Sequence, residues 1–238
     1  MKVHVYDGEQ QACRAAAFLF AAQLTKKPDS VLGLATGSTP IPCYADLVSF
    51  YKQGLLDFSE VVTFNLDEYC QIPLDHPCSY HRFMQENLFG HVNIKKENIH
   101  IPADTGADAG SQYDAAIEAA GGIDLQLLGI GGNGHIGFNE PADAFSCGTH
   151  IVALTQSTIQ ANSRFFDSIH DVPRSAISMG TSNIMASASI VLIATGKAKA
   201  QAIYDTLRGP IDPHVPASIL QLHPSVTFLL DREAAALL

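Results

Sequence analysis

The sequence predicts an α/β protein with a Rossmann-like, mostly parallel sheet that helices cover on both faces. Short apolar, β-rich runs alternate with helical patterns along the chain, and this alternation is typical of parallel sheets. The polar residues of chemical interest follow directly after predicted strands. Ligands of such sheets bind beyond the carboxyl ends of the strands, so this placement supports the same fold class.

The predicted strands are apolar runs bounded by glycine, proline or polar residues. They span residues 3–6, 31–35, 61–66, 98–101, 123–130, 150–154, 176–179, 190–194 and 226–230. The predicted helices span residues 7–24, 40–51, 79–88, 109–120, 156–169 and 198–207. We expect Asp7 to cap the first helix, Pro40 to occupy the first position of the second, and Gly121 with Gly122 to end the fourth.

The composition bounds the domain organisation and the class of ligand. With 238 residues, of which 47% are hydrophobic and 16% charged, the chain can bury a full core, and we expect one domain over residues 1–238. The net charge of -10 argues against binding to nucleic acid, which needs a basic face. It does not exclude a small anionic ligand, because a few well-placed cations suffice.

The five cysteines include no C-x-x-C pair, so we expect free thiols in a reducing compartment. The sequence shows no signal-peptide pattern and no apolar run long enough to span a bilayer. We therefore expect a soluble, cytoplasmic protein with no membrane partner.

An Ala-Thr-Gly-Ser-Thr-Pro segment, residues 35–40, joins a predicted strand to a predicted helix. Free backbone N–H groups and the helix dipole bind anions at such junctions, and Ser38 and Thr39 add hydroxyl donors. The segment lacks the Gly-Lys-Ser/Thr of a Walker A loop. It predicts either an anion site or an ordinary helix cap, and the motif alone does not separate the two.

Two acidic residues, Asp67 and Glu68, follow the predicted strand over 61–66. A partly desolvated carboxylate at the end of a strand can abstract a proton from carbon. Carboxylates are also common in solvated turns, and this segment taken alone favours the turn.

The richest segment runs from Gly129 to Pro141. Its glycines allow tight turns and a close approach of the backbone to a ligand. A histidine in this setting, His135, can transfer protons near neutral pH, and Glu140 can orient its imidazole. A purely structural glycine turn explains the glycines but not the grouping of His135 with Asn139 and Glu140.

The same glycines satisfy the dinucleotide pattern G-x-G-x-x-G after a strand. That pattern should open directly into a helix, with an acidic residue roughly 20 positions later at a strand end. Here the chain continues into His-Ile-Gly-Phe-Asn-Glu-Pro, and residues 150–154 carry no acid. We therefore exclude nicotinamide binding.

Two cations follow predicted elements: Arg164 lies in a helical segment and Lys197 follows a strand. Lys197 can reach a phosphate as a point charge, although each cation taken alone is better explained as a solvated surface residue. The ten histidines are dispersed and no HExxH motif occurs, so we expect no metal site. The G-x-S-x-G motif of serine hydrolases is also missing.

Six segments together resemble the glucosamine-6-phosphate deaminase family, in its short, non-allosteric type. They are LGLATGSTP, VTFNLDEY, HPCSYHRFM, LLGIGGNGHIGFNEP, ANSRFFD and VPASILQLHP, in this order across nearly the whole chain. The resemblance implies a Rossmann-like fold shared with ribose-5-phosphate isomerase and 6-phosphogluconolactonase.

The resemblance also implies residue roles. Asp67 matches the base that abstracts a proton from carbon, and His135 matches the ring-opening acid/base, supported by Glu140 and Asn133. The residues that match the family's phosphate clamp are Gly37, Ser38, Thr39, Arg164 and Lys197. Arg164 would lie in a mobile helical lid around residues 150–180.

The implied reaction releases ammonia from glucosamine 6-phosphate in amino-sugar catabolism. His135 helps to open the sugar ring to the aldehyde, and Asp67 then moves the C2 proton to C1 through an enolamine. Hydrolysis of the resulting C2 imine gives fructose 6-phosphate and ammonia. No cofactor is needed, and each proton transfer typically contributes about 10²–10⁴-fold.

The chain departs from the family pattern at two places. Many members have aspartate where this chain has Asn133, which cannot ionise and is expected to hold His135 or the sugar by hydrogen bonds. Larger hexameric members bind an N-acetylated activator through a cationic pair, and the matching positions here are His150 and Val152. We expect that the chain is not activated in this way; a monomer is favoured, and a homo-oligomer is the alternative.

Two alternatives stay open at this point. A hydrolase resembling 6-phosphogluconolactonase would use the phosphate loop and His135 but would not need Asp67 as a carbon base. A sugar-phosphate sensor that has lost catalysis would need only the clamp, so the presence of Asp67, His135 and Glu140 together argues against it.

Overall fold

The computed structural model describes the backbone of residues 1–238 and every side chain except that of residue 161. Its central sheet has seven strands that pair in parallel. In spatial order these are β1 (Lys2–Tyr6), β10 (Val226–Asp231), β9 (Ile190–Ala194), β6 (Leu125–Leu128), β2 (Val31–Leu34), β3 (Val62–Asn65) and β5 (Ile99–His100). Three strands form a smaller antiparallel sheet in the order β4 (Asp67–Tyr69), β8 (Ser175–Ser178) and β7 (His150–Ala153).

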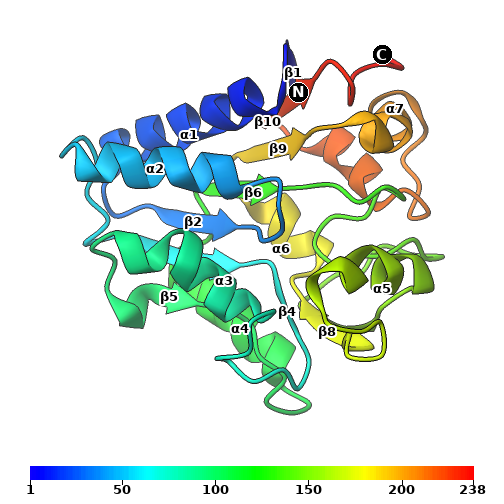
Figure 1. Ribbon diagram of the computed structural model, residues 1–238, viewed down its shortest axis with the longest axis horizontal. Helices are drawn as coiled ribbons and strands as arrows, with labels where there is room; N and C mark the ends of the chain where they lie inside the picture. Colours follow the sequence, from blue (N-terminus) through cyan, green and yellow to red (C-terminus); the bar gives the residue numbers. More distant parts are fainter.

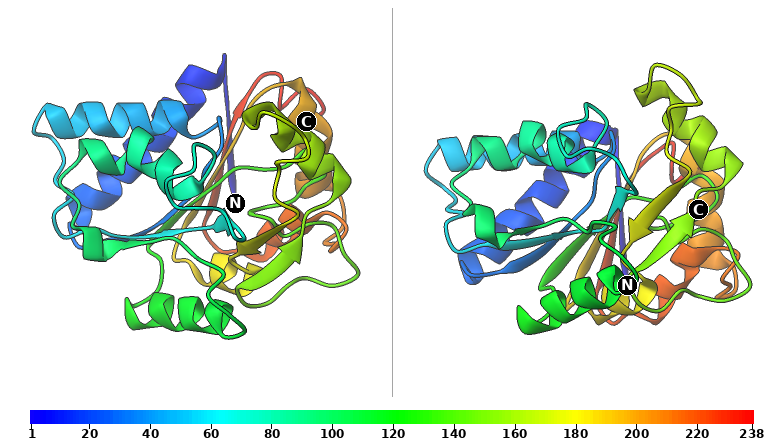
Figure 2. Two further views of the ribbon diagram at one scale, coloured as in Figure 1. Left: turned by 60° about the horizontal axis from the view of Figure 1, so that its bottom comes forward. Right: turned by 90° about the horizontal axis from the view of Figure 1, so that it is seen from below.

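Helices cover both faces of the central sheet (Figures 1 and 2). One face carries α1 (Glu9–Lys26), α2 (Ile41–Lys52) and α3 (Tyr80–Asn87), and the other carries α4 (Ala109–Ala119), α6 (Thr181–Ala186) and α7 (Ala200–Arg208). Right-handed crossovers explain this division, because the chain advances along the sheet in one direction up to β5 and in the opposite direction from β6 onward. The predicted fold class is confirmed.

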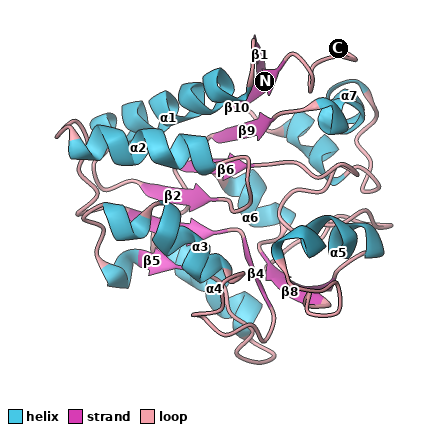
Figure 3. Cartoon of the chain, in the orientation of Figure 1, coloured by secondary structure: helices cyan, strands magenta, loops and turns pink.

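The direction of the crossovers reverses between β2 and β6, which pair directly with Leu32 opposite Leu125. Both strands are buried along their whole length. In parallel sheets such a switch point leaves a crevice beyond the carboxyl ends of the two strands. The arrowheads of β2, β6 and β9 point toward the side of the molecule on which α5 (Gln156–Asn162) lies (Figure 3).

The smaller sheet has an apolar cluster of its own. Its buried members are Tyr69, Phe138, Leu154, Ile159, Val172 and Ala176. The segment over 150–180 contains β7, α5, the 3-10 helix η3 (Ser163–Phe165) and β8, so only its middle is helical. Its motion as a lid, and the assignment of residues 1–238 to one domain, stay predictions.

The end of one helix and the cap of another differ from the prediction. The helix expected over 156–169 ends at Asn162 and η3, because Phe166 is extended and packs its ring on Tyr69 with centroids 5.7 Å apart. Asp7 does not cap α1: Gly8 holds the cap position, and Asp7 Oδ1 lies 2.6 Å from Arg232 Nη2.

The second helix starts one residue later than expected. Pro40 is the cap residue, and α2 begins at Ile41. The helix expected to open at Ser79 is confirmed: Ser79 is the cap residue of α3, and its hydroxyl accepts a hydrogen bond from the backbone N–H of Arg82. Within the described residues, no helix combines the length and the hydropathy that a membrane span requires.

Candidate active site

A cavity of about 680 Å³ opens beyond the carboxyl ends of β2 and β6, and the loops after several strands line it. Seven of the residues singled out from the sequence meet there. They are Gly37, Ser38, Thr39, Asp67, Asn133, His135 and Arg164. Residues that are up to 127 positions apart in the chain therefore share one crevice, as the switch point of the sheet predicts.

The loop after β2 presents its hydroxyls to the cavity. Gly37 has a φ of 96°, a left-handed conformation that glycine adopts without steric cost. Pro40 holds the cap position of α2, and among the described side chains neither Ser38 nor Thr39 caps that helix. The interpretation of these residues as a helix cap is therefore wrong, and both residues line the cavity.

The basic side of the cavity carries Arg164 and Lys199 rather than Lys197. Lys197 is exposed and is not among the described residues that line the cavity, so its expected place in the clamp is wrong. The chain turns at Gly196, with a φ of 85°, into a 3-10 helix, η4 (Lys197–Lys199). Residues two apart in a 3-10 helix point to different sides, since a turn takes about three residues.

Lys199 is half-buried beside a second cation. Burial lowers the pKa of its ammonium group, and the charge of Arg164 lowers this pKa further. Two like charges in a cavity are stabilised by an anion bound between them. The segment Thr-Gly-Lys-Ala-Lys contains two lysines, and the local sequence pattern does not predict which of them faces the cavity.

Asp67 is the first residue of β4 and is buried, with 6% of its surface exposed. It pairs with Ser178 of β8 in the smaller sheet. Burial, together with the neighbouring charge of Glu68, raises the pKa of Asp67 to about 8. The solvated turn that the local sequence favours is therefore wrong: Asp67 is a desolvated carboxyl group in the cavity wall.

Glu68 points away from the cavity and fixes α3. Its carboxylate accepts backbone N–H groups of Tyr69, Tyr80 and His81 at 2.9, 3.0 and 2.9 Å. The two consecutive acids thus have different tasks, because alternate residues of a strand face opposite sides. Burial raises the pKa of Glu68, and these three hydrogen bonds oppose that effect.

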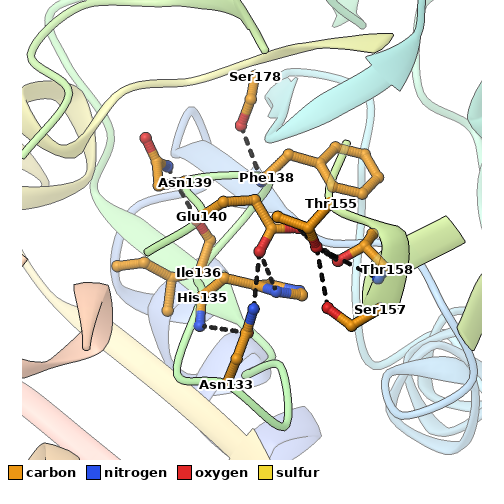
Figure 4. Close-up of polar contacts among 10 residues, drawn as sticks. All are labelled: Asn133, His135, Ile136, Phe138, Asn139, Glu140, Thr155, Ser157, Thr158 and Ser178. Atoms are coloured by element: carbon orange, nitrogen blue, oxygen red, sulfur yellow. Dashed lines mark hydrogen bonds and ion pairs between the residues drawn. The ribbon is translucent and has the colours of Figure 1, made fainter. Parts of the chain in front are cut away.

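The loop after β6 forms a hydrogen-bonded group around Glu140 (Figure 4). Asn133 donates from Nδ2 to Glu140 Oε2 at 2.8 Å and accepts the backbone N–H of His135 at 3.2 Å. His135 Nδ1 lies 3.4 Å from the same carboxylate oxygen. Asn133 therefore holds both partners of the pair, as expected for a residue that cannot ionise.

Glu140 is an ionised carboxylate at neutral pH. Burial by itself would raise its pKa, but the His135 imidazole nearby and the hydrogen bonds from Thr158 and Asn133 lower its pKa to about 2. An ionised carboxylate only accepts hydrogen bonds. The proton of a neutral His135 thus belongs on Nδ1, and Nε2 is left to exchange a proton with a ligand.

The cavity combines a side rich in hydrogen-bond donors and positive charge with a side that carries a carboxyl group and an imidazole. Gly37, Ser38, Thr39, Arg164 and Lys199 supply donors and positive charge, and Asp67 and His135 line the same cavity. Among the described residues, no group of three or more His, Cys, Asp or Glu side chains could hold a metal ion. The expectation that the reaction needs no cofactor stays a prediction.

Residues 7–228 match the family described as glucosamine-6-phosphate isomerases/6-phosphogluconolactonase. The chain belongs to this family. Two members with similar sequences are the glucosamine-6-phosphate deaminases of Thermoanaerobacter pseudethanolicus and Halothermothrix orenii. They are 52% and 53% identical over all of this chain, which covers 95% and 100% of their own lengths.

Solved structures of this family share the fold. A monomeric glucosamine-6-phosphate deaminase superposes with a TM-score of 0.97 at 43% identity, over 100% of both chains. The 6-phosphogluconolactonase of Thermotoga maritima superposes with a TM-score of 0.74 at 18% identity, over 96% of this chain and 97% of its own. At this identity the likeness to the lactonase concerns the fold alone.

Proposed function

We propose that the chain converts glucosamine 6-phosphate and water into fructose 6-phosphate and ammonia. Family members named for this deamination match the chain over its full length at about half identity. The single structural observation that carries the proposal is the buried carboxyl group of Asp67 in the cavity wall. A group placed in this way can take a proton from carbon, which simple lactone hydrolysis does not require.

In the proposed reaction the phosphate lies against the loop of Ser38 and Thr39, with Arg164 and Lys199 as counter-charges. A dianion held at one end of the cavity positions the sugar carbons at the other end. This clamp keeps the cations expected from the sequence except for Lys197, which Lys199 replaces.

The proton transfers follow from the two groups at the other end. His135, oriented by Glu140 and Asn133, moves the ring proton and opens the sugar to the aldehyde. Asp67 then removes the C2 proton to give an enolamine and returns it at C1. Water adds to the resulting C2 imine, the C–N bond breaks, and ammonia leaves together with fructose 6-phosphate.

The test is release of ammonia from glucosamine 6-phosphate by the wild type and by Asp67→Asn. We expect kcat of the variant to fall by about 10²–10⁴-fold, because asparagine cannot accept the C2 proton. The exposed carboxylate Asp29 gives a matched control, and Asp29→Asn should keep the wild-type rate. An Asp67→Asn variant that keeps its activity would refute the assignment of the base.

Two further measurements on the wild type, lactone hydrolysis and ligand binding, separate the alternatives. Hydrolysis of 6-phosphogluconolactone by a wild type that releases no ammonia would establish the lactonase alternative. Binding of glucosamine 6-phosphate without any turnover would establish a sensor.

We further propose that the chain acts as a cytoplasmic monomer. The structural relative at 43% identity is described as monomeric. All five cysteines are free thiols, and this state favours a reducing compartment.

A further inference from the structure

The carboxylate of Glu140 connects two parts of the chain that the reaction uses separately. Its Oε2 faces the loop after β6, where it meets Asn133 and His135. Its Oε1 faces α5, where it accepts a short hydrogen bond from the hydroxyl of Thr158. One carboxylate is thus shared between the proton-transfer histidine and the helix that leads to Arg164 (Figure 4).

The hydroxyl of Thr158 is aimed at Glu140 and at little else. The residue is 5% exposed, so its hydroxyl is largely shielded from bulk solvent. Thr155, the cap residue of α5, accepts the backbone N–H of Thr158 at 3.3 Å and donates its own hydroxyl to Thr158 Oγ1 at 3.1 Å. Thr155 Oγ1 also lies 3.3 Å from Glu140 Oε1, so both threonines of α5 contact this carboxylate oxygen, and Thr158 donates its hydroxyl proton to it directly.

A second contact on the same face of α5 reaches the strand of the carbon base. Asn162, one turn after Thr158, donates to the hydroxyl of Tyr69 at 2.8 Å. Tyr69 and Asp67 belong to the same strand, β4. Residues four apart on a helix share one face. This face of α5 therefore contacts both Glu140 beside His135 and the strand that carries Asp67.

We propose that Thr158 is a positioning residue that couples the docking of α5 to the orientation of Glu140 and His135. When α5 is docked, Arg164 lines the cavity and Glu140 is held against His135. When α5 moves away, Glu140 keeps Asn133 on Oε2 but loses the threonine hydroxyls on Oε1, so one half of its carboxylate is no longer held in place beside His135. The consequence for the rate rests on the proposed deaminase function, whereas the contact itself does not.

The first experiment measures ammonia release by Thr158→Val and Thr158→Ser. Valine has the shape of threonine without the hydroxyl, and serine keeps the hydroxyl. We expect kcat of Thr158→Val to fall about 10- to 100-fold, the effect of a hydrogen bond to a charged group. KM should stay within about threefold, and Thr158→Ser should recover most of kcat. The exposed Gln160 on the same helix gives the control Gln160→Ala, with an unchanged rate.

A double-mutant cycle with Glu140→Gln separates positioning from simple support of the helix. If Thr158 acts through Glu140, Thr158→Val should cost less than about twofold in the Glu140→Gln background, because coupled residues are not additive. A cost that is the same in both backgrounds overturns the proposal. An equal loss of kcat in the serine and valine variants overturns it as well.

Hydrogen exchange of the α5 amides tests the coupling without any turnover. Exchange over residues 156–165 should rise in Thr158→Val and in Glu140→Gln, because each change removes the hydrogen bond from the Thr158 hydroxyl to a charged acceptor, and the rise in the double variant should be smaller than the sum of the two single rises. Unchanged exchange in Glu140→Gln overturns the coupling. A wild type that releases no ammonia but shows this exchange pattern refutes the proposed function and leaves the coupling intact.

Discussion

At the residue scale, Asp67 combines function with a cost in stability. Its carboxyl group is buried beside Glu68, and its pKa rises from 3.8 to about 8. Between these two values the folded chain keeps a proton that the unfolded chain has lost. The stabilisation from the neutral form is therefore complete below pH 3.8 and is lost as the pH rises through 8.

Because the wild type loses stability as the pH rises, we predict that Asp67→Asn becomes more stable than the wild type at high pH. Asparagine stays neutral, whereas Asp67 must ionise in a desolvated place. The Tm difference between variant and wild type should grow by about 5 °C or more from pH 4.5 to pH 8.5. Calorimetry at a series of pH values measures it, with Asp29→Asn, at an exposed position, as the reference variant. A difference that shrinks with pH would mean that Asp67 is ionised without a penalty.

The two lysines after β9 give a second prediction at the same scale. Lys199 lines the cavity with Arg164, whereas Lys197 faces the solvent. Lys199→Ala should raise KM for glucosamine 6-phosphate by about 10- to 100-fold, the cost of losing a charged hydrogen bond. Lys197→Ala is the matched control and should change KM by less than about threefold. The reverse order in steady-state kinetics would restore Lys197 to the clamp.

At the element scale, the loop after β6 holds His135 by close packing of its backbone. A Cβ added to Gly131 would lie 2.4 Å from two ring atoms of His135. The backbone N–H of Gly131 donates to the carbonyl of His135 at 2.8 Å. The loop is therefore closed on itself, and the imidazole lies directly on a residue that has no side chain.

Gly131→Ala should displace the imidazole without unfolding the protein. We expect kcat to fall by about 10²-fold or more, because His135 loses its alignment with Glu140. The Tm should change by about 4 °C or less, since the ring can rotate away from the added methyl group. Gly8→Ala, at the cap of α1 and far from the loop in sequence, should keep the wild-type kcat. Wild-type activity in Gly131→Ala would show that the loop adjusts instead of the ring.

Also at the element scale, α5 shows how tertiary contacts override a local pattern. The polar and apolar spacing from Gln156 to Ile169 favours one helix, yet the helix ends at Asn162. Packing of Phe166 on Tyr69 requires an extended backbone there. The early end of α5 leaves Arg164 in η3, where it lines the cavity.

At the scale of the whole molecule, we predict a monomer with hyperbolic kinetics. The positions that correspond to the cationic activator pair hold His150 and Val152 on β7. The Nδ1 of His150 lies 3.0 Å from the carbonyl oxygen of Gly148, and valine carries no charge. Sedimentation should give the mass of one chain, and N-acetylglucosamine 6-phosphate should leave the rate curve unchanged. A sigmoidal curve that this compound makes hyperbolic would refute the prediction.

The sequence by itself determined the layout of the fold and most of the cavity. Alternating strands and helices predict the parallel sheet, because the periodicity of buried residues is a local property. Strand ends followed by polar residues predict that Ser38, Asp67 and His135 meet, because parallel strands bring their carboxyl ends to one edge. These inferences needed no knowledge of which distant residues touch.

Only the tertiary structure decided the details that depend on distant neighbours. Pairing with β8 makes Asp67 a buried strand residue rather than a turn, and burial sets its pKa. The backbone turn at Gly196 turns Lys199 instead of Lys197 toward the cavity. The contact between Thr158 and Glu140 spans 18 positions. Burial, the direction of a side chain and its charge environment are properties of the packed chain, so no local pattern encodes them.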